Sequence, residues 1–407
     1  MKNLKRCLPF AAALLWMSCS NPSEKAVTQM QEWLKAPKAE RTAVAKTPFA
    51  NVALTKADAL KAEKEILTTC ANDLRPELEK SWNDKTISYK EFEMPLKYKI
   101  FGEAPADGRS LYISMHGGGG APKAVNDQQW NNQIRLYTPE EGVYVAPRAT
   151  TDSWDLWHRP QIDPMFDQII QAAVILEGVN PNKVYVMGYS AGGDGTYQIA
   201  PRMVDRWAAA SMMAGHPGDA SPLNLRNIGF SVWMGEHDKA YRRNEIAAEW
   251  GVKLDKLQAA DPEGYKHECH IVKGKGHWME RQDSVAVPWM ATFTRNPFPK
   301  KLIWKQDNEL HPKMYWVGVP KADRTKEGKI IATYNGNTIN IEETNYKHVQ
   351  LFLNDQMMNL DEPVKVTYNG QKIFNEKVNR TIGTIYATQA KRFDPKMVFT
   401  AQIDLTL

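Results

Sequence analysis

From residue 89 onward, short apolar runs alternate with longer segments whose apolar residues recur at helical spacing. The short runs predict strands and the longer segments predict helices. The expected strands cover residues 96–101, 111–115, 142–146, 184–187, 208–213, 230–234 and 269–272, and the clearest helices cover 165–176, 192–204 and 243–257. Strands that alternate with helices form a mostly parallel, helix-covered sheet. We therefore predict an α/β domain over residues 89–299.

After Pro299 the helical spacing ends, and residues alternate between apolar and polar. Asn335-Gly336 and Asn369-Gly370 each stand between two alternating runs, which is a strong hairpin signal because both residue types adopt positive φ readily. Further alternating runs cover residues 349–353, 364–368 and 399–405. Residues 300–407 are therefore expected to form a small all-β, sandwich-like domain without helices.

The joint between these two domains is Pro297-Phe298-Pro299, with none of the Gly/Ser-rich or Pro-rich spacer that separates independent modules. Trp304, Tyr315 and Trp316 follow this joint within the first strands. We expect them to pack against the preceding domain, so that the two domains move as one. Residues 300–407 are accordingly predicted to have a structural role.

Residues 1–19 begin with basic residues, continue with an apolar run over 8–17 and end with Ser18-Cys19. The run is too short for a transmembrane helix and is typical of a secretory signal peptide. The cysteine after a small residue resembles a bacterial lipobox, which implies a lipoprotein signal peptide over 1–18 and a lipid on Cys19. An ordinary signal peptide cleaved nearby is the alternative. We expect an exported protein, lipid-anchored to a bacterial membrane in the periplasm or at the cell surface.

Residues 19–88 are expected to be a tether followed by a helical extension. Residues 20–50 are polar and rich in Ala, Lys and Pro, as in a flexible linker. Thr55 and Asp58 form a capping-box pattern, which predicts a helix from there to about residue 79.

Composition and charge narrow the class of protein. The chain has 407 residues, 43% hydrophobic and 24% charged, which excludes wholesale disorder. The net charge is +5, but three basic residues lie in the first six, and the remaining 49 basic residues exceed the 47 acidic ones by two. This balance argues against nucleic acid as a partner. Beyond the expected lipid site, Cys70 and Cys269 could form one disulfide or stay free, which is too few for a disulfide framework.

Gly188-Tyr189-Ser190-Ala191-Gly192 lies between a predicted strand and a predicted helix. Gly-x-Ser-x-Gly in this context is typical of a nucleophile elbow, a turn too tight for side chains at the flanking glycines. A plain turn with a buried serine is the alternative. Ser190 is our candidate nucleophile.

His116-Gly117-Gly118-Gly119-Gly120 directly follows the strand predicted over 111–115. Backbone N–H groups of such a loop can stabilise an oxyanion. Gly118 and Gly119, together with the N–H of Ala191 after the nucleophile, are the candidate oxyanion hole. The alternatives are a flexible glycine turn and a phosphate cradle, although the loop lacks the Lys-Ser/Thr ending of a P-loop.

A serine nucleophile needs a general base. His277 lies in a loop after the last predicted strand of the α/β domain, at the sheet edge that also carries Ser190. Asp238, directly after the strand over 230–234, is the candidate acid that orients the histidine; Glu236 and Asp219 compete with it. The chain order Ser190, Asp238, His277 matches a serine triad on an α/β sheet.

Residues 90–298 resemble the α/β-hydrolase superfamily, in the secreted esterase branch that includes polyhydroxybutyrate depolymerase-like, feruloyl-esterase-like and predicted-peptidase sequences. The resemblance implies an α/β-hydrolase sheet covered by helices and an acyl-enzyme mechanism on Ser190, Asp238 and His277, with no cofactor and no metal. We expect a serine hydrolase acting on a small-molecule or polymer ester. A serine peptidase with the same triad is one alternative. A catalytically silent, carbohydrate-binding surface lipoprotein is the other.

Aromatic residues near the predicted carboxyl ends of the strands are candidates for the substrate pocket. They are Trp130, Trp154 and Trp157, to which we add His116 and Tyr189 from the two glycine motifs. Such tryptophans also pack as ordinary core residues. In His267-Glu268-Cys269-His270, alternate residues of a strand point to opposite faces, so a strand is expected here rather than a metal site.

Overall fold

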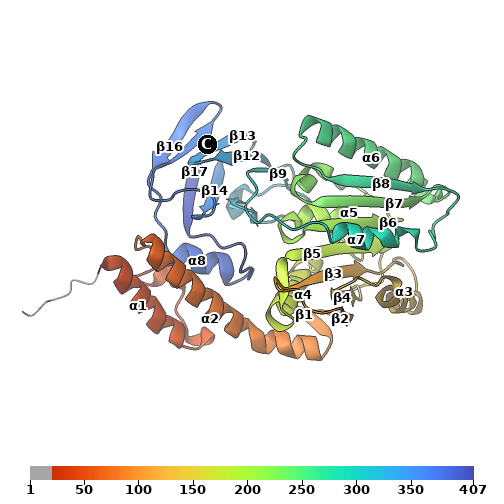
Figure 1. The fold of residues 1–407 in the computed structure, drawn as a ribbon, viewed down its shortest axis with the longest axis horizontal. Helices are drawn as coiled ribbons and strands as arrows, with labels where there is room; N and C mark the ends of the chain where they lie inside the picture. The colour runs from red at the N-terminus through yellow and green to blue at the C-terminus, as the bar shows by residue number, and fades with distance from the viewer. Residues whose placement is uncertain (1–20) are drawn as a thin grey trace, which may run out of the picture.

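The computed structural model describes residues 21–407, so the predicted signal peptide and Cys19 lie outside the described residues. Its centre is an eight-stranded sheet with the order β1-β2-β4-β3-β5-β6-β7-β8 (Figure 1). The strands are β1 (Thr86–Tyr89), β2 (Phe92–Phe101), β3 (Arg109–Met115), β4 (Gly142–Pro147), β5 (Val179–Tyr189), β6 (Ala209–Met213), β7 (Gly229–Gly235) and β8 (His267–Val272).

This sheet has the topology of the α/β-hydrolase fold. The strand β2 runs antiparallel to both of its neighbours, β1 and β4, while every pair from β4 to β8 is parallel. All seven strands expected from the sequence form, and β1 is the one that the pattern did not reveal. The predicted fold class is therefore confirmed.

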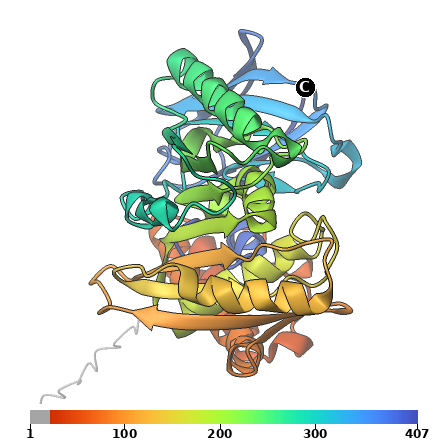
Figure 2. The same ribbon diagram turned by 90° about the vertical axis from the view of Figure 1, so that its right-hand side faces the viewer.

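Helices cover both faces of the sheet because successive side chains of each strand point to opposite faces. On one face, Leu111 and Ile113 of β3 pack into a core with α4 (Ile162–Leu176), α5 (Ala191–Arg202) and α6 (Arg243–Ala260). On the other face, Tyr112 lies in a second core with α3 (Lys123–Leu136) and α7 (Ala286–Met290). The helix α3 crosses the end of the sheet formed by β2 and β4 (Figure 2).

The expected tether is wrong for residues 21–50, which are folded. The helix α1 (Pro22–Lys35) packs along α2 (Lys56–Asn83) and buries Ala26, Val27 and Met30. The spacing of these residues gives a narrow apolar stripe, which the polar average composition conceals. The helix α2 begins at the predicted cap, where Thr55 Oγ1 accepts a hydrogen bond from the Asp58 amide (3.1 Å). Across residues 21–407, every helix is too short or too polar to span a membrane.

Residues 300–407 form two sheets. One has the order β10-β11-β14-β17 and the other β16-β15-β13-β12-β9. Both Asn-Gly turns connect antiparallel hairpins, β12 to β13 and β15 to β16. The strands are β9 (Lys301–Lys305), β10 (Lys313–Met314), β11 (Val317–Gly318), β12 (Lys329–Asn335), β13 (Thr338–Thr344), β14 (His348–Leu353), β15 (Val364–Tyr368), β16 (Gln371–Glu376) and β17 (Ala401–Thr406).

The expectation of no helix in this region is wrong, because α8 (Ile382–Gln389) forms between β16 and β17. Thr381 caps it by accepting from the Thr384 amide (3.2 Å), and Ile382 and Ile385 are fully buried. The helix packs on α2, which also contacts α4 at its other end (Figure 1). The helix α2 therefore joins the C-terminal domain to the central sheet.

The two domains share a buried and partly ionic interface. Tyr315 makes the expected contact: it is fully buried, its hydroxyl donates to the Val204 carbonyl (3.2 Å), and its amide donates to Asp205 (3.0 Å). Asp394 accepts from Arg295 at 2.7 and 3.1 Å, with both side chains at most 1% exposed. Burial opposes the ionisation of Asp394, but Arg295 outweighs that effect and lowers the pKa of the carboxyl.

Removal of one partner from this buried pair should be costly. We expect Asp394→Ala to lower the free energy of unfolding by about 3–5 kcal/mol, because Arg295 would stay buried without its carboxylate. Urea unfolding measures the change. Asp404→Ala, which removes an exposed carboxylate from the same domain, is the matched control and should have an effect below about 0.5 kcal/mol. Similar small effects for both variants would contradict the importance of the buried pair.

Candidate active site

Ser190 occupies a strained turn between β5 and α5. Its φ of 58° and ψ of -121° are rare for a residue with a side chain. A Cβ at Gly188 would overlap the Gly192 carbonyl, and a Cβ at Gly192 would overlap the Met115 carbonyl, so the turn requires glycine at both positions. The Ser190 amide donates to the carbonyl at the end of β6 (2.9 Å), which fixes the turn to the sheet.

Three loops at the carboxyl edge of the sheet bring Ser190, His277 and Asp238 together. Ser190 Oγ lies 2.9 Å from His277 Nε2, and His277 Nδ1 lies 2.6 Å from Asp238 Oδ2. An ionised carboxylate only accepts hydrogen bonds, so Nδ1 carries the proton that it donates to Asp238. Nε2 is then free to accept from the serine hydroxyl. Asp238 is 3% exposed, and Arg243 Nη1 lies 3.8 Å from its other oxygen.

The two competing acids, Glu236 and Asp219, have hydrogen-bond partners other than His277. The Glu236 carboxylate accepts from the Gly274 amide (2.7 Å), so it ties the loop that carries His277 to the end of β7. Asp219 accepts from the side-chain amides of Gln198 and Asn308. Of the three carboxylates considered from the sequence, Asp238 is the one hydrogen-bonded to His277.

Tyr189 fixes the histidine loop from the side of the elbow. Its hydroxyl donates to the His277 carbonyl (2.7 Å) and accepts from the Met279 amide (3.0 Å). Burial raises the pKa of this hydroxyl further above its ordinary value. The side chain therefore stays protonated and holds the backbone from His277 to Met279.

The glycine loop presents one of its two predicted N–H groups to the site. Gly118 lies beside Ser190 in the same cavity, whereas the Gly119 amide donates to Asn126 Oδ1 (2.8 Å). The expectation that Gly119 contributes to an oxyanion hole is therefore wrong, because its donor is already engaged. Among residues 21–407, the amides of Gly118 and Ala191 have no protein acceptor, so these two remain the candidate donors.

Asn126 is a site residue to which the sequence analysis assigned no role. It is fully buried, its Oδ1 holds the Gly119 amide, and its Nδ2 donates to the Ala121 carbonyl (2.9 Å). A Cβ at Gly118 would overlap Asn126 Oδ1, so the asparagine packs directly under the loop. Its place on α3, soon after a glycine-rich loop, is the sequence signal that could have indicated it.

His116 and Trp157, both predicted as pocket residues, are part of the core instead. His116 is fully buried: its Nδ1 donates to the Gly117 carbonyl (2.6 Å), and its Nε2 accepts from the Ala149 amide (3.1 Å). Burial lowers the pKa of this imidazole to about 4, so it is neutral at pH 7. The buried Trp157 indole donates to the His116 carbonyl (3.0 Å). Both residues therefore support the start of the glycine loop from the side of the core.

The triad opens into a cavity of about 610 Å³. One wall is a face of α3, and the opposite wall is formed by the elbow and the histidine loop. Among the described residues that line it, there is no Asp, Glu, Lys or Arg. The lining residues are Gly117, Gly118, Val125, Gln129, Asn132, Gln133, Leu136, Tyr189, Ser190, His277 and Trp278.

Of the five residues predicted for the pocket, Tyr189 lines this cavity. Trp130 points its indole N–H at the Ala146 carbonyl (2.8 Å), and Lys97 lies over its ring. Trp154 is 60% exposed and packs on Gly120, outside the cavity. The helical spacing of Val125, Gln129 and Leu136 was the missed signal, because it places them on the face of α3 toward Ser190.

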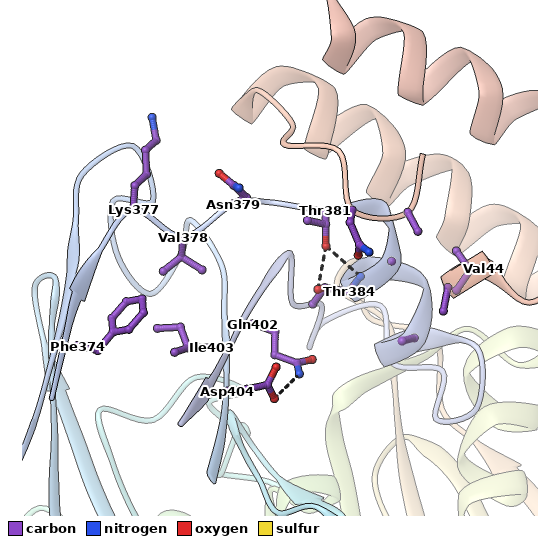
Figure 3. Close-up of a pocket in the computed structure, with 15 residues that line it drawn as sticks. Val44, Phe374, Lys377, Val378, Asn379, Thr381, Thr384, Gln402, Ile403 and Asp404 are labelled. Atoms are coloured by element: carbon purple, nitrogen blue, oxygen red, sulfur yellow. Dashed lines mark hydrogen bonds between the residues drawn. The ribbon is translucent and has the colours of Figure 1, made fainter. Parts of the chain in front are cut away.

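A second cavity, of about 600 Å³, lies far from this chemistry. Figure 3 shows its walls, which come from β16, β17, α8 and the segment before α2. Thr381 is hydrogen-bonded to Thr384 there, and Gln402 to Asp404 (Figure 3). Its lining includes no histidine or cysteine that could pair with these hydroxyl groups, so we do not place an active site in it.

Cys70 and Cys269 are both free thiols, in α2 and β8 respectively. The histidines flanking Cys269 have separate partners: His267 bonds Asp255 (3.1 Å), and His270 stacks on Trp233 with ring centroids 4.0 Å apart. Across residues 21–407, no three His, Cys, Asp or Glu side chains come together as a metal site would require.

Solved structures similar to this one include several esterases. A thermostable esterase matches with 17% identity over 52% of this chain and 64% of its own, at a TM-score of 0.39. Esterase 2 of Thermogutta terrifontis is 17% identical, and the match covers 51% of this chain and 90% of that one at a TM-score of 0.35. An acetyl xylan esterase from Aspergillus awamori is 12% identical, and the match covers 48% of this chain and 93% of that one at a TM-score of 0.33. No family model and no curated protein matches the sequence.

The glycine loop should lose its shape when Asn126 is removed. We expect Asn126→Ala to slow the labelling of Ser190 by a fluorophosphonate at least tenfold, because loss of one oxyanion donor costs about 10²–10³ in rate. Mass spectrometry of the labelled peptide gives the rate. Asn131→Ala, on the same helix but paired with Lys97, is the control and should label at the wild-type rate. Equal rates for all three proteins would show that Asn126 does not position the loop.

Proposed function

We propose that this protein is a serine hydrolase that cleaves a carboxylic ester through an acyl-enzyme. The observation that carries the proposal is the continuous hydrogen-bonded chain from Ser190 Oγ through His277 to the buried Asp238. A serine hydroxyl is a weak nucleophile until a base accepts its proton. The unprotonated Nε2 of His277, held at 2.9 Å, is such a base.

In the first half of the reaction, Ser190 Oγ attacks the ester carbonyl carbon while its proton passes to His277 Nε2. The negative charge that develops on the carbonyl oxygen is stabilised by the Gly118 and Ala191 N–H groups. The C–O bond to the alcohol then breaks, and His277 returns the proton to the leaving oxygen. An alcohol departs, and the acyl group remains on Ser190.

In the second half, water attacks the acyl carbon and gives a proton to His277. The bond to Ser190 Oγ breaks, the serine recovers its proton, and a carboxylic acid leaves. Asp238 stabilises the imidazolium that forms twice in this cycle and keeps Nδ1 protonated. The net reaction consumes one ester and one water and yields one acid and one alcohol.

We further propose that residues 1–18 direct export and that Cys19 carries a lipid. The support is the sequence pattern of a basic start, an apolar run and a small residue before cysteine. In a bacterial host, wild-type protein should incorporate labelled palmitate and partition with membranes, whereas Cys19→Ser should do neither. Palmitate incorporation into Cys19→Ser would contradict the assignment of the lipid to this residue.

Substitutions of different triad residues should lower the activity by different amounts. Ser190→Ala should abolish both p-nitrophenyl acetate hydrolysis and fluorophosphonate labelling. Asp238→Asn should fold normally and lower kcat by about 10³–10⁴, because the amide stabilises the wrong imidazole tautomer. Steady-state kinetics and thermal unfolding of the same preparations separate loss of catalysis from loss of fold.

Glu236→Gln is the matched control for the acid, because it alters a carboxylate two residues away that contacts the loop backbone and not His277. It should retain most of the activity. A large loss in Glu236→Gln with near wild-type Asp238→Asn would overturn the assignment of the acid. Turnover of peptides but of no ester by the wild-type protein would instead favour the peptidase alternative.

A further inference from the structure

Exposed aromatic side chains gather at one edge of the molecule. Within residues 21–407, three aromatic side chains are at least half exposed: Trp154 at 60%, Tyr241 at 64% and Trp278 at 50%. All three belong to loops at the carboxyl edge of the central sheet, beside Ser190. Because clustered apolar surface is unfavourable in water, such a grouping indicates an interaction site.

Trp154 and Tyr241 form one unit, which we call the aromatic shelf. Their rings meet edge to face, with centroids 6.2 Å apart. The Trp154 indole packs directly on Gly120, the last residue of the glycine loop. A Cβ at Gly119, one residue earlier, would come within van der Waals range of the Ala191 side chain. The shelf therefore borders the site through the loop that carries Gly118, one of the two candidate oxyanion donors.

The backbone of the shelf is strained although it is exposed. Tyr241 and Arg242 have φ values of 54° and 56°, in the left-handed region that residues with side chains avoid. The Arg243 guanidinium lies 4.9 Å from the Tyr241 ring centre and 3.8 Å from Asp238. The strained turn therefore fixes the position of the Tyr241 ring on the loop that also carries Asp238, the acid of the triad. Strain of this kind persists where surrounding structure enforces it, commonly at binding sites.

The cavity that Ser190 lines has a different surface. Trp278 packs beside Tyr189, with ring centroids 5.5 Å apart. Facing it, α3 presents the carboxamides of Gln129 and Asn132, and Gln133 is held by Ser114 (2.7 Å). In the described chain Gln129 and Asn132 have no side-chain hydrogen bond. A carboxamide both donates and accepts, so this wall suits a ligand that carries hydroxyl groups.

We propose that the aromatic shelf and this cavity bind two parts of one extended, neutral substrate, an O-acylated oligosaccharide or polysaccharide. The proposal rests on the proposed ester hydrolysis at Ser190. Aromatic rings match the apolar C–H faces of sugar rings, and the carboxamides match their hydroxyl groups. An aliphatic polyester offers acceptors alone and would leave the amide oxygens of Gln129 and Asn132 without donors.

Binding can be measured apart from turnover by using the full-length Ser190→Ala protein. Isothermal titration with a partially O-acetylated xylo-oligosaccharide should show saturable binding to this variant. Adding Trp154→Ala or Tyr241→Ala should weaken that binding about tenfold, as removal of a central aromatic contact typically does. Adding Val252→Ala, which truncates an exposed apolar residue on α6, should not change it.

Kinetics on the active protein supply the second readout. Trp154→Ala should lower kcat/KM for the acetylated oligosaccharide, mainly through KM, about tenfold more than for p-nitrophenyl acetate, and Trp154→Phe should restore most of the loss. Equal losses on both substrates would mean that Trp154 only supports the fold of the glycine loop, and would overturn the proposal. So would saturable binding of poly(3-hydroxybutyrate) oligomers in place of the oligosaccharide. Lack of any esterase activity in the wild type, with oligosaccharide binding intact, would instead refute the proposed function.

Discussion

The close approach of α5 to the end of β3 is the constraint on which the site depends. Because Gly192 lacks a side chain, the first turn of α5 rests on the Met115 carbonyl, immediately before the glycine loop. That contact fixes the turn in which Ser190 adopts a positive φ beside the loop that carries Gly118, which lines the same cavity as Ser190. The strain is opposed by packing on both faces of the sheet, so the geometry exists before any substrate binds.

Three polar side chains support the loops around Ser190. Asn126 holds the glycine loop, Tyr189 holds the histidine loop, and Glu236 ties that loop to β7. Asn126 and Tyr189 are buried, and they hydrogen-bond backbone groups that would otherwise lack partners, so these two are costly to remove. Precise placement of the triad is thus distributed over residues that never touch the reacting atoms.

The sequence predicted the sheet, the two hairpins and the grouping of Ser190, Asp238 and His277, because strand periodicity and glycine spacing are local signals. It did not predict that Asn126 engages the Gly119 amide, since that bond depends on how α3 docks. The sequence did not predict α1, because the polar average composition of residues 20–50 conceals the narrow apolar stripe of this helix. The sequence led us to expect His116 and Trp157 in the pocket, because composition does not show whether an aromatic residue lies on the core side or on the cavity side of a loop.

The core beneath α1 and α2 includes Ile382, Ile385, Phe393 and Val398, which come from the last part of the chain. The helices α1 and α2 therefore cannot cover their apolar faces until residues 382–398 have been synthesised. Contacts of such wide sequence separation slow folding and leave apolar surface open in the meantime. Stable packing of α1 and α2 therefore has to wait for α8 and the segment that follows it.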